Sequence, residues 1–175
     1  MVASTPRNYW MVTMSPSYYQ VTHDRGFDVL GMDRAQKKRV QRMEVGDRVL
    51  FYVVGWRVFP AIVTIDSVYF EDHSHIWDSP DAKEDFPWRV RLRTDIILKE
   101  AEHIDARLLA PRMQYVRKWT PEHWPLAFQG PLHLVPKLDF MMLEDEMRKR
   151  TLNPRLDIGP DPNGRCALDS LPLSQ

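Results

Sequence analysis

The chain of 175 residues has one cysteine, no long apolar run and no excess of charge, and each absence narrows what it can be. Cys166 alone cannot form an intrachain disulfide, so we expect a reducing, cytoplasmic setting. No run approaches the ~18 apolar residues of a membrane span, and residues 1–7 lack the apolar segment of a signal peptide. Basic and acidic residues number 24 each, which argues against strong nonspecific binding to nucleic acid.

Sequence motifs of catalysis are also missing. The chain has no Gly-x-Ser-x-Gly elbow, P-loop, Gly-x-Gly-x-x-Gly or His-Glu-x-x-His pattern. The pair His73 and His75 lies near Asp72 and Asp78, but no cysteine is close by to complete a zinc site. We therefore predict a protein that is not an enzyme, with no catalytic residues, metal or cofactor. A hydrolase or nuclease that uses the His-rich loop is kept as an alternative.

The apolar fraction of 43% is enough for one packed domain. Strand patterns are found at residues 8–14, 48–54, 58–70 and 88–98, and helical patterns at 18–25, 34–43, 101–109 and 138–150. Proline, glycine and aspartate dominate the end of the chain without periodicity. These patterns predict an α/β (α+β) domain over residues 1–150 and a disordered tail over 151–175.

Three short landmarks follow one another along the chain. They are Asn8-Tyr9-Trp10-Met11-Val12-Thr13, then Met43-Glu44-Val45-Gly46-Asp47-Arg48-Val49-Leu50-Phe51-Tyr52, and then Phe86-Pro87-Trp88-Arg89-Val90. In this order the chain resembles the EVE domain of the PUA-like superfamily and its YTH relatives. The resemblance implies a PUA-like mixed β-barrel flanked by short helices, with a modified base held in an aromatic pocket. The family's glycine-rich hairpin turn is replaced here by a bulkier one at residues 53–58.

A base needs aromatic walls and a few fixed polar groups. The residues predicted for such a base-binding pocket are Ser15, Phe27, Tyr52, Trp77 and Asp78. Phe27 stands nearest to where the family often has a cage tryptophan, and Trp77 lies in a polar loop where core packing is a weaker explanation. For Tyr52 a place in the core is an equal alternative, for Phe27 it is an alternative, and for Trp10 and Trp88 it is the favoured interpretation.

Basic residues gather in two places, a helix and one face of a strand. The residues predicted to contact phosphates or the nucleic-acid backbone are Arg34, Lys37, Lys38, Arg89 and Arg91. The alternative is a solvated helix face, with the arginines paired to the acidic loop at Asp81, Glu84 and Asp85. The sequence thus predicts a module that binds DNA or RNA through a modified base, or else an accessory protein that binds a small molecule or free nucleotide.

Overall fold

The computed structural model describes residues 5–6, 8–79 and 84–152, so nearly all of the predicted tail lies outside the described part. The strands are β1 (Tyr9–Met14), β2 (Val29–Met32), β3 (Arg48–Val53), β4 (Val58–Phe59), β5 (Ala61–Ile65), β6 (Phe70–Glu71), β7 (Trp88–Ile97), β8 (Ile104–Asp105) and β9 (Leu132–Leu134). The α-helices are α1 (Pro16–Asp24), α2 (Lys37–Val40), α3 (Ala106–Leu109) and α4 (Lys137–Leu152). Single 3-10 turns lie at residues 34–36, 100–102, 110–112 and 114–116, and a longer one at 121–128.

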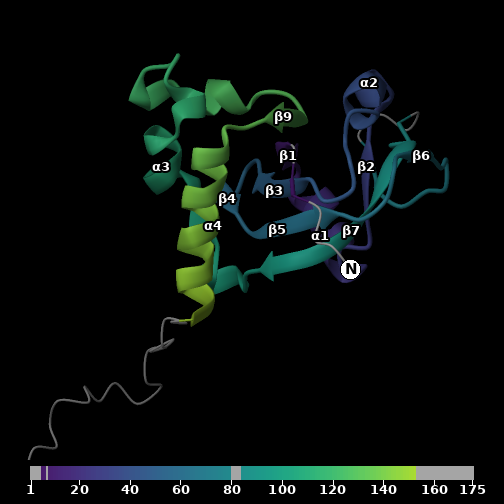
Figure 1. Ribbon diagram of the computed structural model, residues 1–175, viewed down its shortest axis with the longest axis horizontal. Helices are drawn as coiled ribbons and strands as arrows, with labels where there is room; N and C mark the ends of the chain where they lie inside the picture. The colour runs from purple at the N-terminus through teal and green to yellow at the C-terminus, as the bar shows by residue number, and fades with distance from the viewer. Residues whose placement is uncertain (1–4, 7, 80–83, 153–175) are drawn as a thin grey trace, which may run out of the picture.

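One strongly curled sheet organises the molecule, in the order β2-β7-β5-β3-β1-β9. The pair β1 and β3 is parallel, whereas the other neighbours are antiparallel. Figure 1 shows α4 running along one side of this half-barrel, with α2 at its other end beside β2 and β6. The predicted mixed α/β barrel with short flanking helices is confirmed.

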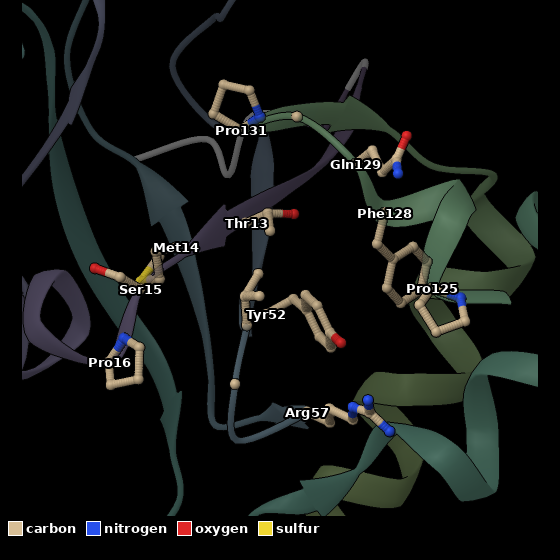
Figure 2. Close-up of a pocket in the computed structure, with 13 residues that line it drawn as sticks. Thr13, Met14, Ser15, Pro16, Tyr52, Arg57, Pro125, Phe128, Gln129 and Pro131 are labelled. Atoms are coloured by element: carbon tan, nitrogen blue, oxygen red, sulfur yellow. The ribbon is translucent and has the colours of Figure 1, made fainter. Parts of the chain in front are cut away.

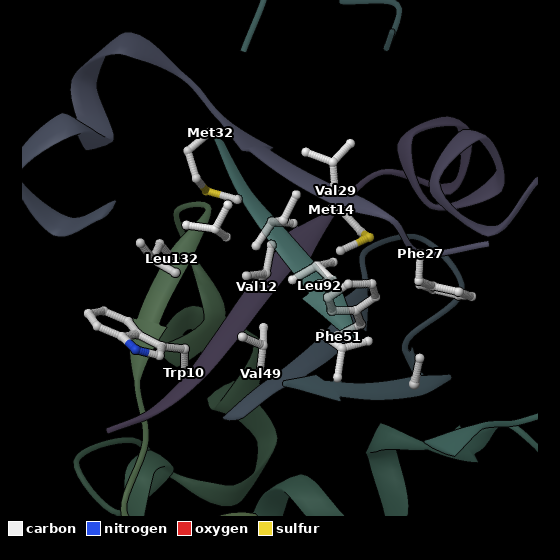
Figure 3. Close-up of a cluster of buried hydrophobic side chains, with 14 of the residues drawn as sticks. Trp10, Val12, Met14, Phe27, Val29, Met32, Val49, Phe51, Leu92 and Leu132 are labelled. Atoms are coloured by element: carbon white, nitrogen blue, oxygen red, sulfur yellow. The ribbon is translucent and has the colours of Figure 1, made fainter. Parts of the chain in front are cut away.

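Both faces of the central strands are buried, as a continuous apolar run predicts. On β3, Val49, Phe51 and Val53 face the core inside the curl, together with Trp10 and the other residues of Figure 3. The alternate residues Leu50 and Tyr52 pack against the second core, which includes Phe140, Leu143 and Met147 of α4. The period of two along each strand therefore divides the core into two halves.

The Gly46-Asp47 turn of the second sequence landmark is hydrogen-bonded to the first landmark. Gly46 has a φ of +94°, a conformation that glycine adopts without steric cost. This places the buried carboxylate of Asp47 where it accepts from the indole Nε1 of Trp10 at 3.1 Å and from the backbone N–H of Asn8 at 3.2 Å and Glu44 at 3.1 Å. Trp10 is thus a core residue, as favoured from the sequence.

Three predicted elements are shorter than expected. The basic helix predicted for residues 34–43 consists of a 3-10 turn at 34–36 and the four residues of α2, and the strand predicted for 58–70 divides at Pro60 and again after Ile65. The helix predicted for 101–109 includes the short strand β8. Helix α4 and strands β1, β3 and β7 agree with the predictions to within two residues. Within the described residues, no helix has both the length and the apolar character needed to cross a membrane.

Candidate functional site

Two adjoining hollows lie at the carboxyl end of β1. The wide pocket, of about 810 Å³, is bounded by β1, the β3–β4 turn and the segment 125–131 (Figure 2). The narrow pocket, of about 130 Å³, is bounded by β1, α1, the end of β2 and Phe86. Both are lined by Thr13, Met14, Ser15 and Pro131. We call the two together the β1-end groove.

The local sequence explains why a groove forms here. β1 ends because Ser15 caps α1, accepting from the N–H of Tyr18 at 3.2 Å, while Pro16 begins the helix. The opposite wall is held by the N–H of Thr13, which donates to the carbonyl of Pro131 at 2.9 Å. The chain thus leaves β1 at a sharp angle, and the side chains at the strand end stay uncovered.

Tyr18 is the main residue of the narrow pocket. Its hydroxyl donates to the carbonyl of Gly31 at 2.6 Å and accepts from the N–H of Gly31 at 2.9 Å. Its ring stacks on Trp77 at 4.7 Å with an interplanar angle of 4°. A Cβ on Gly31 would lie 2.4 Å from Trp77, so only glycine fits. Burial raises the pKa of Tyr18, which keeps the phenol protonated at neutral pH.

Two oxygens of the groove residues have no hydrogen-bond partner. Among the described residues, buried side-chain oxygens without a partner belong to Thr13, Tyr19, Asp33, Gln36 and Asp85. Thr13 lines both pockets, and Asp33 lines the narrow one. Asp33 stands at the N-cap of a 3-10 turn, yet its side chain makes no capping bond. A buried oxygen left unpaired costs about 1–3 kcal/mol, which a ligand that donates to it would recover.

The wide pocket adds aromatic surface and a cation. Tyr52 and Phe128 meet edge to face at 4.9 Å, and Figure 2 shows both rings beside the side chain of Arg57. Burial raises the pKa of Tyr52, although the charge of Arg57 acts in the opposite direction. Arg57 has a φ of +55°, so the turn holds this residue in the left-handed region. Its backbone N–H donates to the carbonyl of Val53 at 2.9 Å.

The five residues predicted for the base pocket do not come together. Ser15 and Tyr52 line the groove, and Tyr52 is at the same time a residue of the second core. Phe27 is buried against Phe51, with ring centroids 5.7 Å apart, and does not line the groove. Asp78 has a side chain 91% exposed and contacts His75. The roles of Ser15 and Tyr52 in binding stay predictions.

The expectation that Trp77 forms an open pocket wall is wrong. Its side chain is 1% exposed, and its indole Nε1 donates to the hydroxyl of Thr22 at 2.9 Å. Phe86 packs edge-on against it at 6.0 Å. The polar residues around Trp77 in the sequence gave no sign of this, because its partners are 55 residues away on α1. Trp77 instead supports Tyr18 from behind the narrow pocket.

The basic residues divide in a similar way. Arg89 is 0% exposed and donates to the carbonyls of Phe86, Ser74 and Asp85, so it is not available to a phosphate, contrary to the prediction. Arg91 is exposed and lies over Phe70, and Lys37 lies 4.5 Å from the Trp88 ring. Lys38 is exposed, and the guanidinium of Arg34 lies 3.6 Å from Asp85. Phosphate contacts by Arg34, Lys37, Lys38 and Arg91 stay predictions.

The His-rich loop is held by ion pairs. His73 bridges Asp85 and Glu71, and His75 contacts Asp78. The hydrogen bonds to Asp85 and Glu71 raise the pKa of His73. In the part of the chain that the structure describes, no three histidine, cysteine, aspartate or glutamate side chains are placed to hold a metal ion.

The groove residues that sequence reasoning missed include Thr13, Tyr18, Asp33, Arg57 and Phe128. Thr13 did carry a signal, because a polar side chain at the carboxyl end of an apolar strand has few core partners. Asp33 directly precedes the helix predicted for residues 34–43, where an aspartate is expected to act as the N-cap, but its side chain makes no capping bond. Phe128 follows β1 by more than a hundred residues and could be placed there only by the fold.

The model of the EVE domain family matches residues 8–120, well over half of the chain. The chain therefore belongs to the EVE domain family, as the landmarks indicated. A UPF0310 protein of Pyrococcus abyssi is 25% identical over 146 residues, which cover 78% of this chain and 97% of that protein.

Solved structures share the fold at low sequence identity. The YTH domain of the MRB1 protein of Zygosaccharomyces rouxii, in complex with N6-methyladenosine RNA, matches with a TM-score of 0.57 and 12% identity, over 83% of this chain and 90% of that one. The Pho92 YTH domain in complex with m6A gives 0.58 and 14%, over 83% and 87%. At these identities the likeness shows a common YTH-like, PUA-like fold.

Proposed function

We propose that this protein is a binding module, without catalytic activity, that holds one modified base of a nucleic acid in the β1-end groove. The observation that carries the proposal is that Thr13 Oγ1 and Asp33 Oδ1 lack partners at the same groove. Membership of the EVE family supports it. So does the fold shared with YTH domains whose complexes contain N6-methyladenosine.

The polar groups of the narrow pocket suit the edge of an amino-bearing base such as adenine or cytosine. There the carboxylate of Asp33 can accept from an exocyclic amine. The hydroxyl of Thr13 lies on the wide-pocket side of β1 (Figure 2) and can donate to an acceptor of the ligand in that part of the groove. The apolar side chains of Met14, Met32 and Pro131 line the same pocket. A methyl group buried against them gains about 0.8 kcal/mol, equivalent to about a fourfold preference for the methylated base.

An arginine adjoins each of the two pockets of the groove. Arg57 lines the wide pocket, and Arg34 directly follows Asp33 of the narrow pocket. Each would neutralise one phosphate, so the affinity for a single strand should fall with log salt at a slope of roughly −1.4. This local pair is compatible with the neutral total charge of the chain.

A titration with nine-nucleotide RNA and DNA strands tests the proposal. Each strand carries one N6-methyladenine, one 5-methylcytosine or the unmodified base, and binding is followed by fluorescence anisotropy at several salt concentrations. We expect at least a fourfold preference for one modified strand and a measurable salt slope. Equal, weak binding of all strands would contradict the proposal.

A free nucleotide is the second candidate ligand, because the wide pocket falls within the range of about 300–1,000 Å³ typical of small-molecule sites. In that case a modified mononucleotide would bind as tightly as the nine-nucleotide strand. Its affinity would also change little between low and high salt, because a free nucleotide lacks the strand's other phosphates.

A further inference from the structure

A second cleft, of about 480 Å³, lies on the other side of the β3–β4 turn from the wide pocket. Its walls come from α1, from the turn and from the segment 98–103. The aromatic side chains of Tyr19, Trp56 and His103 are among those that line it. We call it the Trp56 cleft. None of the residues predicted from the sequence for base or phosphate binding lines it.

Trp56 presents an open aromatic face in this cleft. The side chain is 45% exposed, whereas most large aromatic side chains of the barrel are buried. Its nearest parallel ring is His103, at 6.5 Å between centroids and 26° between planes. The buried Tyr18–Trp77 stack, by contrast, has centroids 4.7 Å apart. His103 therefore covers little of the Trp56 face, and a flat ring could stack there.

The cleft also has a polar group without a partner. The hydroxyl of Tyr19 is buried and makes no hydrogen bond within the described residues. Burial raises the pKa of Tyr19 to about 12, so the hydroxyl stays protonated and can donate. Lys99 stands in the same cleft and supplies a cation for a phosphate. A flat ring attached to a phosphate, with an acceptor at its edge, could stack on Trp56, accept from Tyr19 and place its phosphate near Lys99.

The β3–β4 turn places this cleft next to the β1-end groove. Gly55 and Arg57 line the wide pocket, while Trp56 between them lines the cleft. The wide pocket and the cleft therefore share the backbone of this turn. Gly55 has no side chain to obstruct the path, since even an added Cβ would meet only Pro16, at 3.7 Å.

We propose that the Trp56 cleft binds the nucleobase next to the one held in the β1-end groove, with Trp56 stacking on it and Tyr19 donating to its edge. The inference rests on the proposed function, because it needs a strand that already has one base in the groove. It gives a role to Trp56, an exposed aromatic residue of the β3–β4 turn.

The test combines a protein change with a change in the strand. Wild type, Trp56→Ala and Trp56→Phe are titrated with the preferred nine-nucleotide strand. The titrations are repeated with strands in which the nucleotide on one or the other side of the modified base is abasic. Trp119→Ala is the matched control, because Trp119 is 43% exposed and lines neither the groove nor the cleft.

We expect Trp56→Ala to weaken binding by about tenfold, as the loss of one stacked base does. One abasic neighbour should cost wild type the same factor and cost Trp56→Ala nothing further, because both changes remove one contact. Trp56→Phe should recover part of the loss, and Trp119→Ala should bind like wild type.

Three results overturn the inference, and the third is distinguishable from the first two. If Trp56→Ala binds like wild type while the modified base is still preferred, the cleft has no part in binding but the proposed function holds. The same conclusion follows if the combined loss of affinity equals the loss from the abasic neighbour multiplied by the loss from Trp56→Ala, because the two changes are then independent. If no strand binds with a preference, the proposed function fails and the inference fails with it.

Discussion

The loop between β6 and β7 and the β1-end groove meet at Tyr18, but they differ in how their polar groups are used. Arg89 of β7 donates to three backbone carbonyls in the described part of the loop, where His73 also bridges two carboxylates. In the groove, Thr13 and Asp33 each have a buried oxygen with no partner. The loop is rich in residues that often bind ligands, yet its polar groups are mostly engaged in holding the loop itself.

The difference shows that residue type alone does not identify a site in this chain. An aromatic ring or a guanidinium is available to a ligand only if the fold leaves its face or its donors unused. Trp77 and Arg89 are used internally, at 1% and 0% exposure. Trp56 and Arg57 are exposed, although the residue types of the two pairs are the same.

The largest expected effect is on the loop side of the comparison. Trp77→Ala removes a fully buried indole that stacks on Tyr18, and we expect it to lower the free energy of unfolding by about 3–5 kcal/mol. Urea denaturation measures the change. Trp77→Phe, which keeps a ring against Tyr18, should lose less. If Trp77→Ala kept near-normal stability but specifically lost base binding, Trp77 would be part of the binding site.

A smaller effect is expected in the groove, where a substitution should change binding and leave stability nearly unchanged. Thr13→Val removes a hydroxyl that has no partner in the free protein, so stability should stay the same or rise slightly. Binding of the preferred strand should weaken about fivefold, the equivalent of one hydrogen bond of about 1 kcal/mol. Thermal melting and anisotropy on the same preparation separate the two. A clear loss of stability would mean that the hydroxyl has a structural partner.

Strands with apolar periodicity could be predicted from the sequence, and so could α4, because local patterns determine them. β7 needed only the alternation of its side chains, β3 the continuous apolar run after the Gly46-Asp47 turn, and β1 its aromatic and β-favouring residues. The site could not be predicted in the same way. The place of Trp77 depends on Thr22, 55 residues away, and the groove needs Phe128 beside Tyr52. Arg89 shares a strand face with Arg91, but the loop covers only the first of them.

The smallest effect concerns pH. Hydrogen bonds to Asp85 and Glu71 raise the pKa of His73 above its ordinary value of about 6.5. The stabilisation of the loop by protonated His73 is therefore fully present below pH 6.5. It is lost as the pH rises through the higher pKa that His73 has in the folded state. An NMR titration should show this raised pKa in wild type and a lower one in Asp85→Asn.

Histidine is absent from the described residues that line the groove, whereas His23 and His103 line the Trp56 cleft. The affinity for a modified base with an abasic nucleotide on each side should therefore change little between pH 6 and 8. If the affinity instead followed the titration of His73, the loop would belong to the binding site after all.

One measurement tests most directly whether the base is held in the groove and not at the loop. Asp33→Asn and Asp78→Asn make the same change of charge, the first beside the narrow pocket and the second on an exposed loop residue. Both are titrated with the preferred modified strand. We predict about a tenfold loss of affinity for Asp33→Asn, as expected for a hydrogen bond to a charged group, and wild-type affinity for Asp78→Asn. A loss confined to Asp78→Asn would contradict the account.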